Sequence, residues 1–168
     1  MPDTVTATGV AALNGLAPAR AREALAGCCA SERWVTAMER ARPYASAGAV
    51  LDHAEAAFDA LADEDWLHAF AAHARIGAPR ADDARGAAEQ AGAGAASAEE
   101  RAALETGNER YEAKFGHVFL IRASGLDAAH MLAALRERLE NSPAQELALA
   151  ARQQREITRL RLRALLAP

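Results

Sequence analysis

One helix in this sequence has ends that local side chains alone can define. Ser97 and Glu100 form an S-x-x-E capping box, in which each side chain can bond the backbone N–H of the other residue at a helix start. Large side chains then recur at helical spacing from Leu104 to Phe115, and Gly116 follows as a typical helix-ending residue. The sequence therefore predicts a long helix here, with one face that other elements must cover.

The same helical spacing recurs through most of the chain. Leu51, Ala54, Phe58 and Leu61 repeat over successive turns, and residues that can cap a helix precede several such runs. Alanine dominates the composition and aromatic residues make up only 5%, which favours closely packed helices over a sheet. A chain of 168 residues is long enough for one domain with a real core. We predict an all-α fold, a single-domain bundle of about seven or eight helices, with a short apolar segment over residues 10–16 and helical segments near residues 18–27, 32–41, 46–61, 63–73, 97–115, 127–140 and 142–165.

Charge and targeting signals narrow the function classes. The net charge is −4, from 19 basic and 23 acidic residues, so the chain lacks the positive footprint of proteins that bind nucleic acid or anionic membranes. The sequence shows no signal peptide and no membrane-spanning apolar stretch, and it ends in residues 166–168, Leu-Ala-Pro, rather than in a Ser-Lys-Leu import signal. We therefore expect a soluble cytoplasmic protein. Its adjacent cysteines, Cys28 and Cys29, lack metal-binding spacing and are expected to be small buried side chains.

A candidate functional histidine follows two aromatic residues. Trp66, Phe70 and His73 stand at i, i+4 and i+7, so a helix here places two aromatic rings and an imidazole on one face. His73 would lie in the last turn, because Gly77 and Pro79 stop the helix. There the histidine can either cap the helix, where the macrodipole favours a cation, or point into a pocket. The local sequence leaves both alternatives open.

Residues 78–97 differ in composition from the segments on either side. They are rich in glycine and alanine and contain the polar pair Glu89-Gln90. This composition favours a linker, or a mobile loop with a short helix inside it. Because long irregular segments in compact domains are often functional, we expect a flexible active-site segment here.

Several familiar site types do not occur in the sequence. It has no HExxH motif, no Walker loop, no G-x-G-x-x-G turn after a strand and no G-x-S-x-G elbow. Asn108 stands in the apolar stripe of the helix after Ser97, where a buried amide needs hydrogen-bond partners. It either orders nearby loop backbone or serves a site. Convincing metal-ligand spacing is found in no pair of the histidines, which are His53, His68, His73, His117 and His130.

The remaining polar motifs occur in an order that points to one family. From Leu13 to Leu165, the chain resembles the OHCU decarboxylase family, where OHCU is 2-oxo-4-hydroxy-4-carboxy-5-ureidoimidazoline, an intermediate late in urate degradation. The motifs that carry the resemblance are His73-x-Arg75-Ile76-Gly77, Glu89-Gln90-Ala-Gly-Ala, Asn108-x-x-Tyr111-x-x-Lys114-Phe115-Gly116-x-x-Phe119, Arg138-x-x-Asn141-x-x-x-x-Glu146 and Arg161-Leu162.

The resemblance implies a function and a set of site residues. It implies an all-helical lyase of purine metabolism that decarboxylates OHCU to (S)-allantoin with no metal and no organic cofactor; the family is often dimeric, so a homodimer is one expected assembly. His73 matches the catalytic histidine and Glu89 its acidic partner. The implied substrate-binding positions are Ala74, Gly86, Gln90, Leu120, Ile121, Arg122, Ala123, Ser124 and Arg161.

The substrate's own chemistry agrees with these roles. It carries a carboxylate and a hydroxyl on one carbon, beside an imine that can accept the electrons released with carbon dioxide. The protein then has to supply orientation, a proton relay and fixed chirality. We expect His73, whose residue type titrates near neutral pH, to handle the hydroxyl proton. Glu89 would orient the imidazole or the ureido group, or return the proton, and Arg161 would hold an anionic or carbonyl oxygen.

Two positions depart from the family pattern. The family usually has proline where this chain has Ala74, and serine where it has Gly86. Proline would restrain the residue before it, and the serine hydroxyl would supply one hydrogen bond. These departures motivate a second hypothesis, a diverged family member that acts on another small ureide or imidazolone. A third is a non-enzymatic helical interaction module, in which the residues near His73 serve packing alone.

Overall fold

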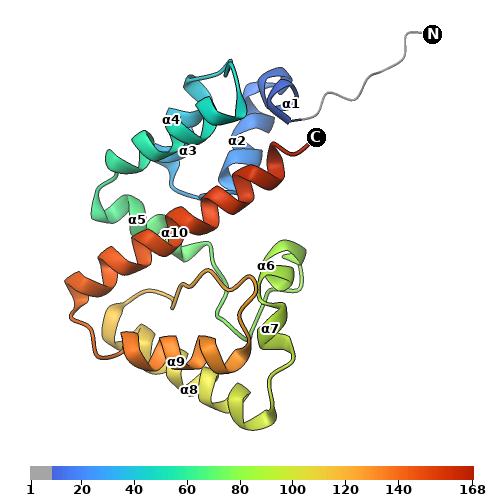
Figure 1. Ribbon diagram of the computed structural model, residues 1–168. Helices are drawn as coiled ribbons and strands as arrows, with labels where there is room; N and C mark the ends of the chain where they lie inside the picture. The colour runs from blue at the N-terminus through green and yellow to red at the C-terminus, as the bar shows by residue number, and fades with distance from the viewer. Residues whose placement is uncertain (1–8) are drawn as a thin grey trace. The chain divides into compact units, whose positions relative to one another are not determined.

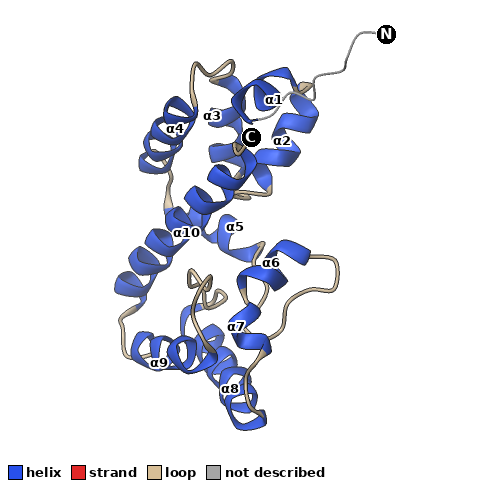
Figure 2. Cartoon of the chain, turned by 45° about the vertical axis from the view of Figure 1, so that its right-hand side comes forward, coloured by secondary structure: helices blue, strands red, loops and turns tan. Residues whose placement is uncertain are grey.

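The computed structural model describes residues 9–168, and this part of the chain is all-helical, as predicted (Figures 1 and 2). The described residues form ten helices and no strand, and eight of these helices are seven residues or longer. Their bounds are α1 (Gly9–Gly15), α2 (Pro18–Ala26), α3 (Glu32–Arg40), α4 (Ala47–Asp59), α5 (Asp63–Ala71), α6 (Ala84–Glu89), α7 (Ala91–Gly94), α8 (Ala98–Phe115), α9 (Ala128–Arg138) and α10 (Pro143–Leu165).

The chain divides into two compact units. Among the described residues, unit 1 comprises residues 9–69 and 155–168, and unit 2 comprises residues 70–154. The divisions fall within α5 and α10, so each of these two helices contributes residues to both units. The single-domain organisation over residues 1–168 stays a prediction.

Unit 1 has an aromatic core. Trp34 stacks on Phe58 with ring centroids 5.5 Å apart, and Phe58 stacks on Trp66 at 5.4 Å. All three rings are buried, and the Arg155 guanidinium lies 5.2 Å from the centre of the Phe58 ring. Stacked aromatic pairs and a cation over a ring add attraction beyond burial alone, so this cluster joins α3, α4, α5 and α10 within unit 1.

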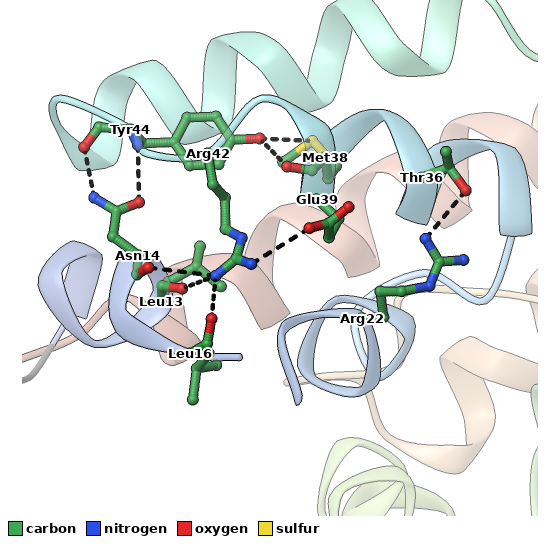
Figure 3. A network of polar contacts seen from close by, with 9 residues as sticks. All are labelled: Leu13, Asn14, Leu16, Arg22, Thr36, Met38, Glu39, Arg42 and Tyr44. Carbon is green, nitrogen blue, oxygen red and sulfur yellow. Dashed lines mark hydrogen bonds and ion pairs between the residues drawn. The ribbon is translucent and has the colours of Figure 1, made fainter. Parts of the chain in front are cut away.

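A polar network fastens α1 to the segment after α3 (Figure 3). The Arg42 guanidinium donates hydrogen bonds to the carbonyls of Leu13 and Leu16, both at 2.8 Å. The Asn14 amide donates to the Tyr44 carbonyl and accepts from the Tyr44 N–H, each at 2.8 Å. The Arg42 bonds thus hold the Leu13 carbonyl in the last turn of α1 and the Leu16 carbonyl just beyond it, and the Asn14 bonds hold the backbone of Tyr44.

The two cysteines lie in unit 1. Cys28 and Cys29 are both buried, as the sequence predicted, and they form no disulfide. Burial raises the pKa of the Cys29 thiol to about 11, against smaller opposing contributions from hydrogen bonds of Ser31 and Thr158. The thiol therefore stays protonated and behaves as a small apolar side chain.

Unit 2 is organised around α8 and α9. The predicted capping box is present, because Ser97 Oγ accepts from the Glu100 N–H and Glu100 accepts from the Ser97 N–H. Gly116 ends α8 with φ +77°, a conformation that favours glycine. A Cβ on Gly107 would lie 2.5 Å from Cδ2 of Leu135, so glycine allows these two helices to approach closely. The buried core beside them includes Ile76, Leu104, Tyr111, Phe119, Met131 and Leu135.

The structure corrects two local predictions. The helix from residue 63 was expected to reach His73, but α5 ends at Ala71, and the His73 N–H bonds the Phe70 carbonyl in a turn. The chain leaves the helix because Ile76 is buried in the unit 2 core and Gly77 takes φ +87°. Residues 78–97 hold two short helices, α6 and α7, rather than one. Whether this segment is mobile stays a prediction.

Candidate active site

His73 lies just beyond the end of α5, in unit 2. Its side chain is half-buried, and Nε2 lies 2.7 Å from Oε1 of Gln154 in α10. Gln154 is fully buried, and it was not among the predicted site residues. This contact joins the imidazole to a neutral amide rather than to the carbonyls at the end of α5, so helix capping does not account for it. A role of His73 in a site stays a prediction.

The turn that follows His73 is fixed to α8 by side chains. Arg75 makes a bidentate ion pair with Glu112, with N–O distances of 2.8 and 2.6 Å. The buried Asn108 amide donates to the Ile76 carbonyl at 3.0 Å, so Asn108 orders loop backbone, one of the two roles the sequence left open. A bidentate arginine fixes geometry as well as charge, and a buried amide tolerates few alternatives. The backbone leaving His73 is thus restrained.

Gln90 fastens the same turn to α6. Its side-chain oxygen accepts a hydrogen bond from the Gly77 N–H at 3.0 Å, and the Gln90 side chain is buried. Glu89, the predicted acidic partner of His73, is the last residue of α6 and is half-buried. Asp83 begins α6 as its N-cap, accepting from the N–H of Gly86 at 2.8 Å. The short helix therefore places Glu89 next to a residue that contacts the turn after His73.

The predicted backbone segment 120–124 is held at two points. The Arg122 N–H donates to Oε1 of Gln153 in α10 at 2.8 Å, and the Leu120 carbonyl accepts from the Arg138 guanidinium at 2.5 Å. Leu120 is buried, and no residue of the segment belongs to a helix or strand. The segment is therefore extended core backbone whose polar groups are bonded by side chains.

A buried ion pair supports the Leu120 carbonyl. Arg138 and Glu146 lie within 2.7 Å, and both are almost completely buried. Glu146 also accepts hydrogen bonds from the Tyr111 hydroxyl and from the Asn141 amide. Burial, followed by the bond to Glu146, raises the pKa of Tyr111, so its hydroxyl stays a donor. The opposite charge beside each group and the further hydrogen bonds around the pair offset the cost of burying two charges.

Two consecutive glutamines of α10 bring predicted site segments together. Gln154 contacts His73, and Gln153 contacts the backbone of Arg122. Sequence reasoning missed both residues. A signal was present, because Gln154 interrupts the inner stripe of α10 between Ala150 and Ile157, and a polar side chain on a buried face needs a specific partner.

Arg161, the predicted anion-binding residue, belongs to unit 1. Its guanidinium is half-buried and donates to the Gly27 carbonyl at 3.2 Å. In the same helix, Arg155 and Arg159 both pair with Glu55. The proposed contact of Arg161 with substrate stays a prediction.

The chain matches a known protein family over most of its length. The model of the family described as OHCU decarboxylase matches residues 14–163. The chain belongs to the OHCU decarboxylase family. This confirms the family predicted from the motifs between His73 and Leu162.

Individual relatives agree with this membership. The uric acid degradation bifunctional protein TTL of Arabidopsis thaliana is 39% identical over 142 residues, covering 80% of this chain and 44% of that protein. The chain thus spans less than half the length of this curated relative. A crystal structure of OHCU decarboxylase in the presence of (S)-allantoin is 33% identical, with a TM-score of 0.78, covering 88% of this chain and 99% of that one. A crystal structure of (S)-allantoin synthase shares the fold at 18% identity, with a TM-score of 0.73, covering 95% of this chain and 54% of the other.

One departure from the OHCU decarboxylase pattern has a local structural reason. At Gly86, where the family usually has serine, a Cβ would lie 2.2 Å from Oδ2 of Asp83. The capping carboxylate of α6 therefore occupies the space that a side chain would need. Nothing comparable explains Ala74, which is half-buried.

Residues 9–168 hold neither a cluster of metal-ligating side chains nor a helix that could span a membrane. In this range, no three side chains of His, Cys, Asp or Glu gather as a metal site would require. None of the helices in the same range is both long enough and apolar enough to cross a bilayer.

Proposed function

We propose that this protein is a carboxy-lyase that converts OHCU to (S)-allantoin in urate degradation. The observation that carries the proposal is the pair of contacts from Gln154 to His73 and from Gln153 to Arg122, in a chain of the OHCU decarboxylase family. The relatives add support, since one is described as a uric acid degradation protein and another was crystallised with (S)-allantoin. Membership of this family also favours an enzyme over a non-enzymatic interaction module.

The proposed reaction needs little covalent help from the protein. The bond between the ring carbon and the carboxylate breaks, and its electron pair moves toward the adjacent imine. The hydroxyl on the same carbon loses its proton and becomes a ring carbonyl. The former imine nitrogen takes up one proton and one face of the neighbouring carbon takes up another, so the reaction releases carbon dioxide and consumes one proton from solvent overall. His73 takes the hydroxyl proton as a general base, and Glu89 orients the imidazole or the ureido group, or delivers the second proton.

The remaining positions bind and orient the substrate in this proposal. Gln90 and the backbone of residues 120–124 contact the ring and ureido groups, Ala74 and Gly86 line the site, and Arg161 holds an anionic or carbonyl oxygen. We further propose that the enzyme works in the cytoplasm, as a homodimer, without a metal or an organic cofactor. Orientation is the main contribution asked of the chain, because the imine already serves as the electron acceptor.

A coupled assay tests the reaction. OHCU is generated freshly in the presence of the purified protein, and the rate of its disappearance and the chirality of allantoin are followed by circular dichroism. We expect accelerated loss of OHCU and one enantiomer of allantoin. Racemic allantoin at the spontaneous rate would instead support the diverged family member, which would then be assayed with other small ureides and imidazolones.

A further inference from the structure

Gln154 is a polar residue in an otherwise apolar position. It lies on the buried face of α10 between Ala150, four residues before it, and Ile157, three residues after it, and all three side chains are buried. Placing a carboxamide there is costly unless specific hydrogen bonds compensate. One of these bonds joins it to the His73 ring.

The hydrogen bond between the side chains of Gln154 and His73 has a defined donor and a defined acceptor. Oε1 of Gln154 faces Nε2 of His73 at 2.7 Å, a short distance for a hydrogen bond of this type. A carboxamide oxygen can only accept, so the imidazole nitrogen must donate and carry the hydrogen. In neutral imidazole one nitrogen is the donor and the other the acceptor. Nδ1 is therefore the nitrogen that bears the lone pair in this tautomer.

We propose that Gln154 is a positioning residue that fixes His73 as the Nε2–H tautomer, so that Nδ1 is the atom that receives the substrate proton. The proposal rests on the proposed function, in which His73 is the general base. It adds a residue outside the predicted site and assigns the proton acceptor to one nitrogen. Gln154 acts through the imidazole and does not itself touch the reacting atoms.

The choice of a neutral amide agrees with this role. A carboxylate at position 154 would also accept from Nε2–H, but its charge would favour the protonated imidazole, which has no lone pair for a substrate proton. An apolar side chain would leave the ring without this bond. Glutamine supplies the acceptor without the charge. Its neighbour Gln153 bonds the Arg122 N–H, so the same turn of α10 also fixes the segment 120–124.

Nuclear magnetic resonance of the full chain with ¹⁵N-labelled histidine tests the tautomer directly. At a pH where His73 is neutral, we expect its ring nitrogens to show the Nε2–H pattern, with a slowly exchanging Nε2–H proton. In Gln154→Met that proton should exchange rapidly and the two tautomers should mix. In Gln154→Glu the bond should persist and the imidazolium should survive to higher pH. His68 and His130, both exposed, serve as internal references whose signals should not change.

Kinetics with freshly generated OHCU provide the second measurement. Gln154→Met should lower kcat by up to about tenfold, the scale of one net hydrogen bond, with little change in KM. Gln145→Glu is the matched control for Gln154→Glu, because it adds the same charge to an exposed residue of α10 and keeps a suitable capping side chain.

Two results would overturn the positioning role. One is an Nδ1–H tautomer of His73 in the unchanged protein, a measurement that does not depend on the folding of any variant. The other is an active parent enzyme whose tautomer and kcat are the same in folded Gln154→Met. A parent protein with the Nε2–H tautomer but no effect on OHCU would overturn the proposed function instead, and with it the role of Nδ1 as proton acceptor.

Discussion

The side-chain oxygen of Gln90 accepts a hydrogen bond from the backbone N–H of Gly77 across 3.0 Å. This bond joins two segments that are 13 residues apart, the end of α6 and the turn after His73. Because Glu89 precedes Gln90 directly, the bond also limits where Glu89 can lie relative to that turn. It is the contact that ties the glycine-rich segment to the rest of the candidate site.

Removing this acceptor should loosen the turn. Gln90→Leu keeps the side chain's approximate size but cannot accept from Gly77, so we expect a loss of about 0.5–1.5 kcal/mol in the free energy of unfolding. Hydrogen exchange should become faster at the Gly77 amide. The Arg122 amide, which bonds Gln153 instead, is the internal control and should keep its protection. Unchanged exchange at Gly77 would show that the bond does not restrain the turn.

Replacing Arg138, which forms a buried ion pair with Glu146, should destabilise the fold far more than replacing an exposed arginine nearby. Arg138→Met leaves the Glu146 carboxylate buried without its cation, which typically costs about 3–5 kcal/mol. It also removes the donor to the Leu120 carbonyl, so the Arg122 amide should exchange faster. Urea denaturation measures the first effect. Arg136→Met is the matched control, because Arg136 is an exposed residue of α9. A similar loss of unfolding free energy in that variant would contradict the special role of the buried pair.

Restoring the serine that the family usually has should conflict with the cap of α6. A Cβ at position 86 would lie 2.2 Å from Asp83 Oδ2, so Gly86→Ser should displace the capping carboxylate and cost about 1 kcal/mol. In the background of Asp83→Ala the same substitution should cost much less. A double-mutant cycle by urea denaturation measures this coupling. Strictly additive effects would mean that the two side chains do not compete for space.

Replacing each of the two glycines of α7 by alanine should have opposite effects on the stability of the protein. A Cβ on Gly92 would lie 1.8 Å from the Leu126 carbonyl oxygen, and that backbone would have to move, so we expect a cost of about 1–3 kcal/mol. At Gly94 nothing lies within 4 Å of such a Cβ, so Gly94→Ala should be neutral or stabilise by up to about 1 kcal/mol. Thermal unfolding compares the two variants. Equal midpoints would contradict the close approach at Gly92.

Acid should weaken unit 1 through Glu55. The hydrogen bond from Arg159 lowers the pKa of Glu55 below its ordinary value, against a smaller opposing effect of burial, and Arg155 adds to the lowering. A carboxylate with a depressed pKa stabilises the folded state above its unfolded pKa, and this contribution is lost as the pH falls through the folded pKa.

Glu55→Gln should therefore lower the unfolding free energy at neutral pH by about 0.5–1 kcal/mol, a modest value because solvent screens the partly exposed pair. As the pH falls below the ordinary carboxyl pKa and through the lowered pKa of Glu55, the variant and parent should converge. Urea denaturation across pH measures the difference. Asp52→Asn, at an exposed residue of the same helix, should leave the free energy of unfolding unchanged. A constant difference at all pH values would mean that Glu55 titrates normally.

The fold was largely predictable because local signals agreed with the global pattern. The capping box at Ser97 and the glycine at position 116 define α8 as expected, and the seven predicted helical segments correspond to α2, α3, α4, α5, α8, α9 and α10. The end of α5 was placed two residues too late, because the burial of Ile76 and the contacts of Arg75 are tertiary effects that periodicity cannot reveal. Residues 84–94 hold the two short helices α6 and α7, in which Gly92 allows a close approach of the Leu126 carbonyl whereas Gly94 has open space around it.

The candidate site was predictable in its residue types but not in its connections. Resemblance selected His73, Glu89 and the segment 120–124, yet only the structure shows that α10 joins two of these through Gln153 and Gln154. Those contacts span 31 and 81 residues, which local patterns cannot pair. A polar residue that interrupts an apolar stripe was the available signal.

The chirality of allantoin formed from fresh OHCU, compared between the parent protein and His73→Ala, tests whether His73 carries the proposed reaction. His68→Ala is the matched control, because His68 is an exposed residue of α5. We predict (S)-allantoin from the parent and from His68→Ala, and racemic allantoin at the spontaneous rate from His73→Ala with its helical circular dichroism intact. Accelerated formation of (S)-allantoin by His73→Ala would contradict the account.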